Sequence, residues 1–204
     1  GSYMGRQIGA FWVCLGALFT AGSAQAEASF YDRLVKSANE RTKHHVVYDP
    51  AYTRLAYPGG DVPKDRGVCT DVVIRSYRAL GIDLQKLVHE DMRGNFSLYP
   101  KHWGLKGPDK NIDHRRVPNL QTFFKRHGKS LSKSRRAEDY RPGDLVTWNV
   151  ASGGWLPHIG VVVDARSADG KRPLIVHNIG AGPVAEDILF AFEMTGHYRF
   201  EPKP

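Results

Sequence analysis

Three residues that together could carry out nucleophilic catalysis are spread along the chain: Cys69, His158 and His177. A thiol attacks a carbonyl carbon as a thiolate, so it needs a base to take its proton, and that base needs a partner to orient it. Asn178 directly follows His177 and is an alternative third member. This set of residues, in this chain order, predicts acyl-transfer chemistry such as the cleavage of an amide bond.

Cys69 stands at the start of a predicted helix. Apolar or partly apolar residues follow at close to helical spacing, namely Val68, Val72, Val73, Tyr77 and Leu80. We expect Asp65 to cap the helix and Gly81 to end it in a left-handed turn. Unpaired N–H groups and the helix dipole favour an anion in the first turn, which predicts a lowered thiol pKa. The alternative is a small buried hydrophobe, which is the commoner fate of a lone cysteine.

The two histidines fall on a predicted β-hairpin. Its strands are residues 159–163 and 174–177, with a turn at Asp169-Gly170. If residues 164 and 173 flank the hairpin loop, paired residue numbers sum to about 337, so His158 faces residues 177 to 179. A slip of one residue exchanges His177 for Asn178, and both therefore remain candidates for the orienting residue.

The elements that must position these side chains change character along the chain. Helices are predicted from Ser29 to near Arg41, at 82–92 and at 119–128, before strands at 145–148, 159–163, 174–177 and 197–200. Residues 45–48 form a short β-rich run, 93–118 a long irregular passage, and 129–136 a basic surface loop. Helices followed by strands predict an α+β domain with N-terminal helices packed on an antiparallel sheet.

The N-terminus has the pattern of a targeting segment. Residues 1–3 are interpreted as a cloning remnant and 4–26 as a signal peptide, with Arg6, an apolar run and Ala24-Gln25-Ala26 as the cleavage site. The apolar run is shorter than the roughly 20 residues of a membrane span. Residues 27–204 then form a single periplasmic or secreted bacterial domain. Cys14 leaves with the signal, and an odd cysteine in a secreted protein indicates either a reactive thiol or an intermolecular bridge.

Charge limits the partners. The formal net charge is +8, and loss of residues 1–26 removes only Arg6, which leaves +7. Such a surface favours anionic lipid or the acidic bacterial cell wall, and secretion argues against nucleic acid. We expect no cofactor or metal: His89-Glu90 lacks a second histidine four residues on, and His44, His45 and His102 lack ligand spacing.

Several stretches together resemble the NlpC-like cell-wall cysteine peptidases, which have a papain-like fold. The resemblance covers roughly residues 48–200 and rests on Cys69 opening a helix, on the Cys, His, His order, and on residues 141–146, 157–162 and 175–177. Residues 57–61, 67–71 and 111–119 are similar to a secreted bacterial family of unknown function within that superfamily. Val68-Cys69-Thr70-Asp71 departs from the usual Asp-Cys-Ser-Gly, and the long insert also differs, so substrate specificity should differ.

The resemblance implies a papain-like α+β fold and cleavage of an amide in peptidoglycan stem peptides. Cys69 would attack, His158 would shuttle the proton, and His177 would orient it. The Cys69 N–H and the Tyr48 hydroxyl would form an oxyanion hole. Asp71, as favourable charge in the first helical turn, and Trp155 would lie at the substrate cleft. The competing hypotheses are a non-catalytic module that binds anionic wall or membrane polymers, and a lipid or acyl transferase of related fold.

Overall fold

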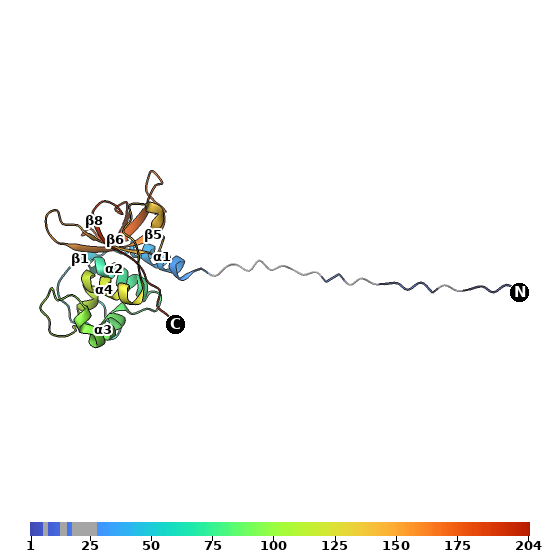
Figure 1. Ribbon diagram of the computed structural model, residues 1–204, viewed down its shortest axis with the longest axis horizontal. Helices are drawn as coiled ribbons and strands as arrows, with labels where there is room; N and C mark the ends of the chain where they lie inside the picture. The colour runs from blue at the N-terminus through green and yellow to red at the C-terminus, as the bar shows by residue number, and fades with distance from the viewer. Residues whose placement is uncertain (6–7, 13–15, 18–27) are drawn as a thin grey trace.

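The computed structural model describes residues 1–5, 8–12, 16–17 and 28–204. Cys14 and the expected cleavage site after Ala26 lie outside these residues. The folded part consists of helices packed against a sheet, with the sheet in the upper half of Figure 1 and the helices below it. No helix of the described residues is both long and apolar enough to cross a membrane.

In the part of the chain that the structure describes, four α-helices come before most of the sheet, as expected. They are α1 (Phe30–Arg41), α2 (Cys69–Arg78), α3 (Leu84–Asn95) and α4 (Val117–His127). Ser29 caps α1 in a reciprocal box with Asp32, because each side chain accepts from the other residue's N–H. Three 3-10 turns, η1 (Phe96–Leu98), η2 (Asp113–Arg115) and η3 (Ala137–Asp139), occupy stretches expected to be irregular.

The first turn of α2 is built differently from the expectation. Val68, not Asp65, is the N-cap residue, and its N–H donates to Asp71 Oδ2 at 2.7 Å. Asp71 therefore satisfies the helix start from inside the first turn. Gly81, at φ +80°, follows the helix as predicted, and its N–H donates to the Arg78 carbonyl.

The main sheet has six strands in the order β3-β8-β4-β5-β6-β7, and every neighbouring pair is antiparallel, which confirms the predicted α+β class. The strands are β3 (Lys129–Ser130), β4 (Leu145–Asn149), β5 (Pro157–Arg166), β6 (Pro173–His177), β7 (Val184–Glu186) and β8 (Glu193–Arg199). The prediction of a loop over 129–136 is wrong at its start, because Lys129 and Ser130 pair with β8. Strand β7 was not predicted.

Two apolar clusters hold the layers together. On one face, Val161 and Val163 of β5 join the core formed by α1, α2 and α4. On the other, Val162 of β5 and Ile175 of β6 pack with Trp148. This alternation follows from the two-residue period of a strand. It fixes the register of the strands that carry both histidines.

Candidate active site

Cys69 is the first residue of α2, and its side chain packs against strand β5. Backbone N–H groups of Ile159, Thr70 and Cys69 itself point at the sulfur, and each lowers the thiol pKa. The side chain retains 5% of its surface exposed. The sulfur thus lies beside the backbone of the residue that follows His158.

The expected lowering of the Cys69 pKa is wrong for this state of the protein. Burial raises the pKa of the thiol to about 12 and outweighs the three N–H groups. A thiolate loses its hydration on burial, and a helix N-terminus offsets only part of that cost. At neutral pH the site therefore holds a protonated thiol.

His158, His177 and Glu186 form a chain of hydrogen bonds across strands β5, β6 and β7. His158 Nε2 lies 2.8 Å from His177 Nδ1, and His177 Nε2 lies 2.9 Å from Glu186 Oε1. Both imidazoles are buried, whereas Glu186 is half exposed. Burial lowers the pKa of His158 to about 3, with a smaller contribution from His177, and burial also lowers the pKa of His177.

The positions of the protons in these hydrogen bonds follow from Glu186, the outermost group. A carboxylate only accepts, so His177 Nε2 must carry the proton that it donates to Glu186. A neutral His177 then has a lone pair on Nδ1, which accepts from Nε2–H of His158. The remaining nitrogen of neutral His158, Nδ1, is left with a lone pair. Glu186 and His177 therefore make His158 Nδ1 the basic atom.

The strand register explains why the two rings meet. Val161 pairs with Val176 and Val162 with Ile175, so paired numbers sum to 337, as the hairpin count predicted. By continuation His177 lies opposite Gly160, and His158 is its diagonal neighbour on the same face. Asn178 instead accepts from the N–H groups of Gly180 and Gly182 with Oδ1. The alternative in which Asn178 orients His158 is therefore wrong, because its side chain organises the following loop.

Gly160 leaves the space that this arrangement needs. A Cβ there would lie 2.4 Å from Ile175 Cγ2 and 3.2 Å from His177 Cβ. We expect Gly160→Ala to lower the free energy of unfolding by about 1–3 kcal/mol, because an overpacked strand pair must move apart. Denaturant unfolding measures this. Gly154→Ala is the matched control, since its nearest neighbour would be Ala151 Cβ at 3.6 Å, and equal stability of the two variants would contradict the prediction.

Tyr48, which was predicted to donate to the oxyanion, lies next to the cysteine turn. Strand β1 (Val47–Tyr48) pairs in parallel with β2 (Arg66–Gly67), which leads directly into Val68 and Cys69. Partial burial raises the pKa of Tyr48, and negative charge on Cys69 or Asp71 raises it further. The phenol therefore remains protonated and is available as a hydrogen-bond donor near the sulfur.

Asp71 does not line a cleft, contrary to the prediction. It is 2% exposed, and its two oxygens accept from Arg115 Nε and Nη2, both at 3.0 Å. Thr70 Oγ1 also donates to the Arg115 carbonyl. The carboxylate is thus fully used in tying the cysteine turn to η2, inside the long insert.

Trp155 lies on the loop between β4 and β5 and is 57% exposed. Its ring stacks at a tilt against His102, with centroids 5.1 Å apart, so it contacts the 93–118 insert. Trp103 of the same insert packs against the Arg116 guanidinium, 4.2 Å from ring centroid to Cζ. The insert therefore reaches both the cysteine turn, through η2, and the loop before His158.

In the part of the chain that the structure describes, the Cys69 thiol and the His158 imidazole form no hydrogen bond with each other. Such contacts are commonly loose in unliganded hydrolases and tighten when substrate binds. The resting protein thus holds a neutral thiol with N–H and O–H donors around the sulfur. The residue before Ile159 on β5 carries a neutral imidazole with a basic Nδ1, whose ring packs against Trp148. These are the groups that acyl transfer by a cysteine requires.

The buried imidazole predicts loss of stability in acid. In the unfolded chain His158 binds a proton near its ordinary pKa of 6.5, whereas in the folded protein its pKa is about 3. The free energy of unfolding should therefore fall as pH drops from 6.5 towards 3, at up to about 1.4 kcal/mol per pH unit for this residue. Denaturant unfolding at a series of pH values measures how steeply the free energy of unfolding falls in acid. The fall should be less steep in His158→Gln than in the native protein. His45→Gln, which changes an exposed histidine, is the control and should keep the native dependence. Equal slopes for native protein and His158→Gln would contradict the assignment.

Sequence reasoning missed Glu186, Arg115 and Gly160. Glu186 follows Val184-Ala185, a strand too short to stand out by pattern, although continuing the ladder from His177 would have found it. Arg115 lies within the 111–119 stretch on which the resemblance drew, but nothing in its local sequence indicates that Asp71 is its partner.

Comparison with known proteins finds a close relative and remote structural neighbours. The uncharacterized protein YijF of Escherichia coli K12 is 53% identical over 176 residues, covering 86% of this chain and 84% of that protein. NlpC2 and NlpC1 of Trichomonas vaginalis are each 16% identical, with TM-scores of 0.45. The matches cover 84% and 85% of this chain but only 47% and 45% of those structures. Residues 35–200 match the domain of unknown function DUF1287, and the chain therefore belongs to that family.

Proposed function

We propose that this protein is a cysteine hydrolase that cleaves an amide bond in the peptide part of peptidoglycan. The proposal rests on the hydrogen bonds from Glu186 through His177 to His158, which leave a basic nitrogen on His158. The backbone N–H of the next residue, Ile159, points at the Cys69 sulfur. The same hydrogen bonds fix the tautomer of both histidines.

The proposed reaction runs in two halves. His158 Nδ1 takes the proton of Cys69 as the sulfur attacks the carbonyl carbon, and the Cys69 N–H and Tyr48 hydroxyl donate to the developing oxyanion. The imidazolium returns the proton to the leaving amine as the C–N bond breaks, which leaves a thioester on Cys69. Water, deprotonated by His158, then attacks the thioester and releases the carboxylic acid and the thiol.

His177 and Glu186 act on His158 rather than on substrate. Their hydrogen bonds hold the imidazole in one tautomer and stabilise its charged form during each half-reaction. We further propose a periplasmic or secreted location and a peptidoglycan fragment as the substrate, on the grounds of the N-terminal pattern and the +7 charge of residues 27–204.

Incubating residues 27–204 with purified sacculi tests the proposal. Mass spectrometry of the soluble fraction should show new peptide ends, each cut adding one water. Salt-sensitive binding to sacculi without new ends would instead support the non-catalytic binding module. An acyl group transferred to an added amine or lipid, in place of water, would support the transferase.

A further inference from the structure

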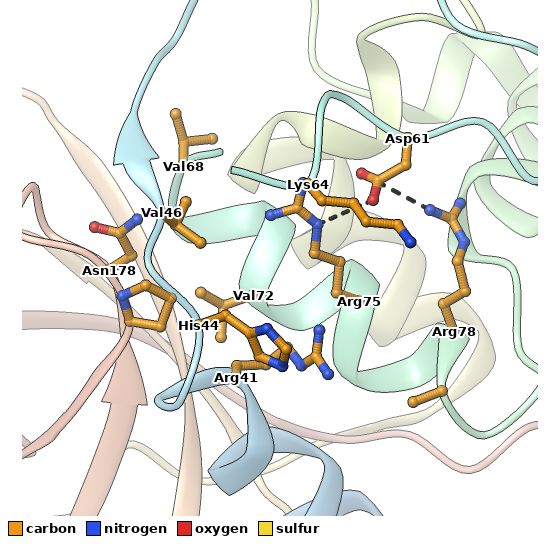
Figure 2. Close-up of a pocket in the computed structure, with 12 residues that line it drawn as sticks. Arg41, His44, Val46, Asp61, Lys64, Val68, Val72, Arg75, Arg78 and Asn178 are labelled. Atoms are coloured by element: carbon orange, nitrogen blue, oxygen red, sulfur yellow. Dashed lines mark hydrogen bonds and ion pairs between the residues drawn. The ribbon is translucent and has the colours of Figure 1, made fainter. Parts of the chain in front are cut away.

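A basic cavity lies along helix α2, beside the turn that carries the thiol. It has a volume of about 360 Å³ and lies between the end of α1, the 44–46 and 61–64 segments, α2 and the loop after β6 (Figure 2). Val68 and Val72 line it, as do Asn178 and Pro183. The cavity therefore adjoins the residue before Cys69 and the residue after His177, without including either candidate catalytic side chain.

The wall of the cavity carries an excess of positive charge. Arg41, Lys64, Arg75 and Arg78 line it against one carboxylate, Asp61. The Asp61 carboxylate contacts Arg75 Nε at 3.0 Å and Arg78 Nη1 at 3.9 Å (Figure 2). The Nη2 of Arg75 donates to three backbone carbonyls, so this residue belongs to the scaffold. Arg78 also donates from Nη2 to Asp83 Oδ1 at 3.3 Å, so both of these guanidiniums already have carboxylate partners. Arg41 and Lys64 have no acidic partner in the wall.

Three side chains of this wall hold buried donors without acceptors. Arg41 Nε, Arg78 Nε and Asn178 Nδ2 have no hydrogen-bond partner among the described residues, whereas Arg78 Nη1 keeps its 3.9 Å ion contact with Asp61. Asn178 is 0% exposed, and its Oδ1 is already committed to the loop, which turns the amide nitrogen to the side of Val46 (Figure 2). Buried donors are normally satisfied, so unpartnered donors in the wall of a cavity indicate an acceptor supplied by a ligand or by water.

We propose that this cavity binds the carboxylate of a small organic acid that has an apolar body, such as the free C-terminus of a short peptide. The Arg41 guanidinium and the Asn178 amide would donate to the carboxylate oxygens. Val46, Val68 and Val72 would cover the apolar body, which an inorganic anion lacks. The volume suits a ligand of a few residues at most. This site is independent of the proposed chemistry, because none of its donors contacts Cys69.

Titration with N-acetyl-alanyl-alanine, with its C-terminal amide and with inorganic phosphate, followed by calorimetry and NMR, tests the site. We expect the free acid to bind saturably and at least about ten-fold tighter than the amide or phosphate, since each charge-assisted hydrogen bond contributes about that much. Arg41→Gln should weaken binding of the acid at least ten-fold. Arg33→Gln, on the exposed face of the same helix, is the charge-matched control and should stay within two-fold of native.

Asn178→Asp is a second variant that keeps the loop acceptor and replaces the unpartnered donor by an acidic oxygen. It should also weaken binding at least ten-fold. Cys69→Ala should bind the acid like the native protein. The binding result can therefore be interpreted even if the hydrolase proposal fails. Equal binding of acid and amide, tighter binding of phosphate, or native affinity in both Arg41→Gln and Asn178→Asp would overturn the proposal.

Discussion

Cys69→Ala is expected to lower the rate of peptide release from sacculi by at least about 10³-fold, because no other group in the site can form the thioester. The change removes one sulfur from a side chain in the first helical turn, and circular dichroism should show the native fold. Release quantified by mass spectrometry measures the effect.

Cys14→Ala, made in the chain expressed from Met4 and assayed beside the same chain with Cys69→Ala, is the matched control for the loss of a thiol. If residues 4–26 are a signal peptide, this change should leave the rate at the native value, since Cys14 would be absent from the mature chain. Equal rates for native protein and Cys69→Ala would rule out the proposed nucleophile. A rate loss in Cys14→Ala equal to that in Cys69→Ala would show that the effect is not specific to the site.

Arg115→Met is expected to lower the free energy of unfolding by about 3–5 kcal/mol. The Asp71 carboxylate is buried and receives both of its charged hydrogen bonds from this guanidinium, and its removal leaves an unpaired buried charge. The turn that carries Cys69 should be the part of the structure that is most disturbed, because the same carboxylate accepts from the Val68 N–H. Denaturant unfolding measures the change.

Two further variants distinguish the effect of an unpaired buried charge on stability from the effect of removing any arginine. Arg66→Met removes the exposed pair with Asp49 and should cost less than about 1 kcal/mol. Asp71→Asn combined with Arg115→Met neutralises the stranded charge while keeping an acceptor for Val68, so it should be more stable than Arg115→Met alone. A cost below 1 kcal/mol for Arg115→Met would contradict the structural role given to the pair.

Local sequence was sufficient where neighbours in the chain decide the outcome. Ser29 and Asp32 define the start of α1, Gly81 defines the end of α2, and alternation along β5 and β6 brings His158 and His177 together. These features depend on spacing and on hydrogen bonds within a few residues.

Features that depend on distant partners were not predictable in the same way. The first turn of α2 is completed by Asp71 because Arg115 lies across from it, 44 residues further on. The Cys69 pKa rises because the surrounding helices and β5 remove water, which the helix N-terminus alone does not indicate. Glu186 reaches His177 from a three-residue strand whose sequence has no strong pattern. In each case, packing between remote segments determines the chemistry of the residue.

The central claim is that the Cys69 thiol and the His158 imidazole share a proton, and the pH dependence of Cys69 alkylation tests it most directly. When the imidazole takes the thiol proton, the pair holds one proton in either form, so its thiolate–imidazolium fraction does not change with pH between the two macroscopic pKa values of the pair. Mass spectrometry of the Cys69 peptide after timed exposure to iodoacetamide should give a rate plateau from about pH 5 to pH 9 in native protein and in His45→Ala. In His158→Ala the rate should instead rise about ten-fold per pH unit, because the thiol then loses its proton only to solvent. Identical pH profiles for native protein and His158→Ala would contradict the account.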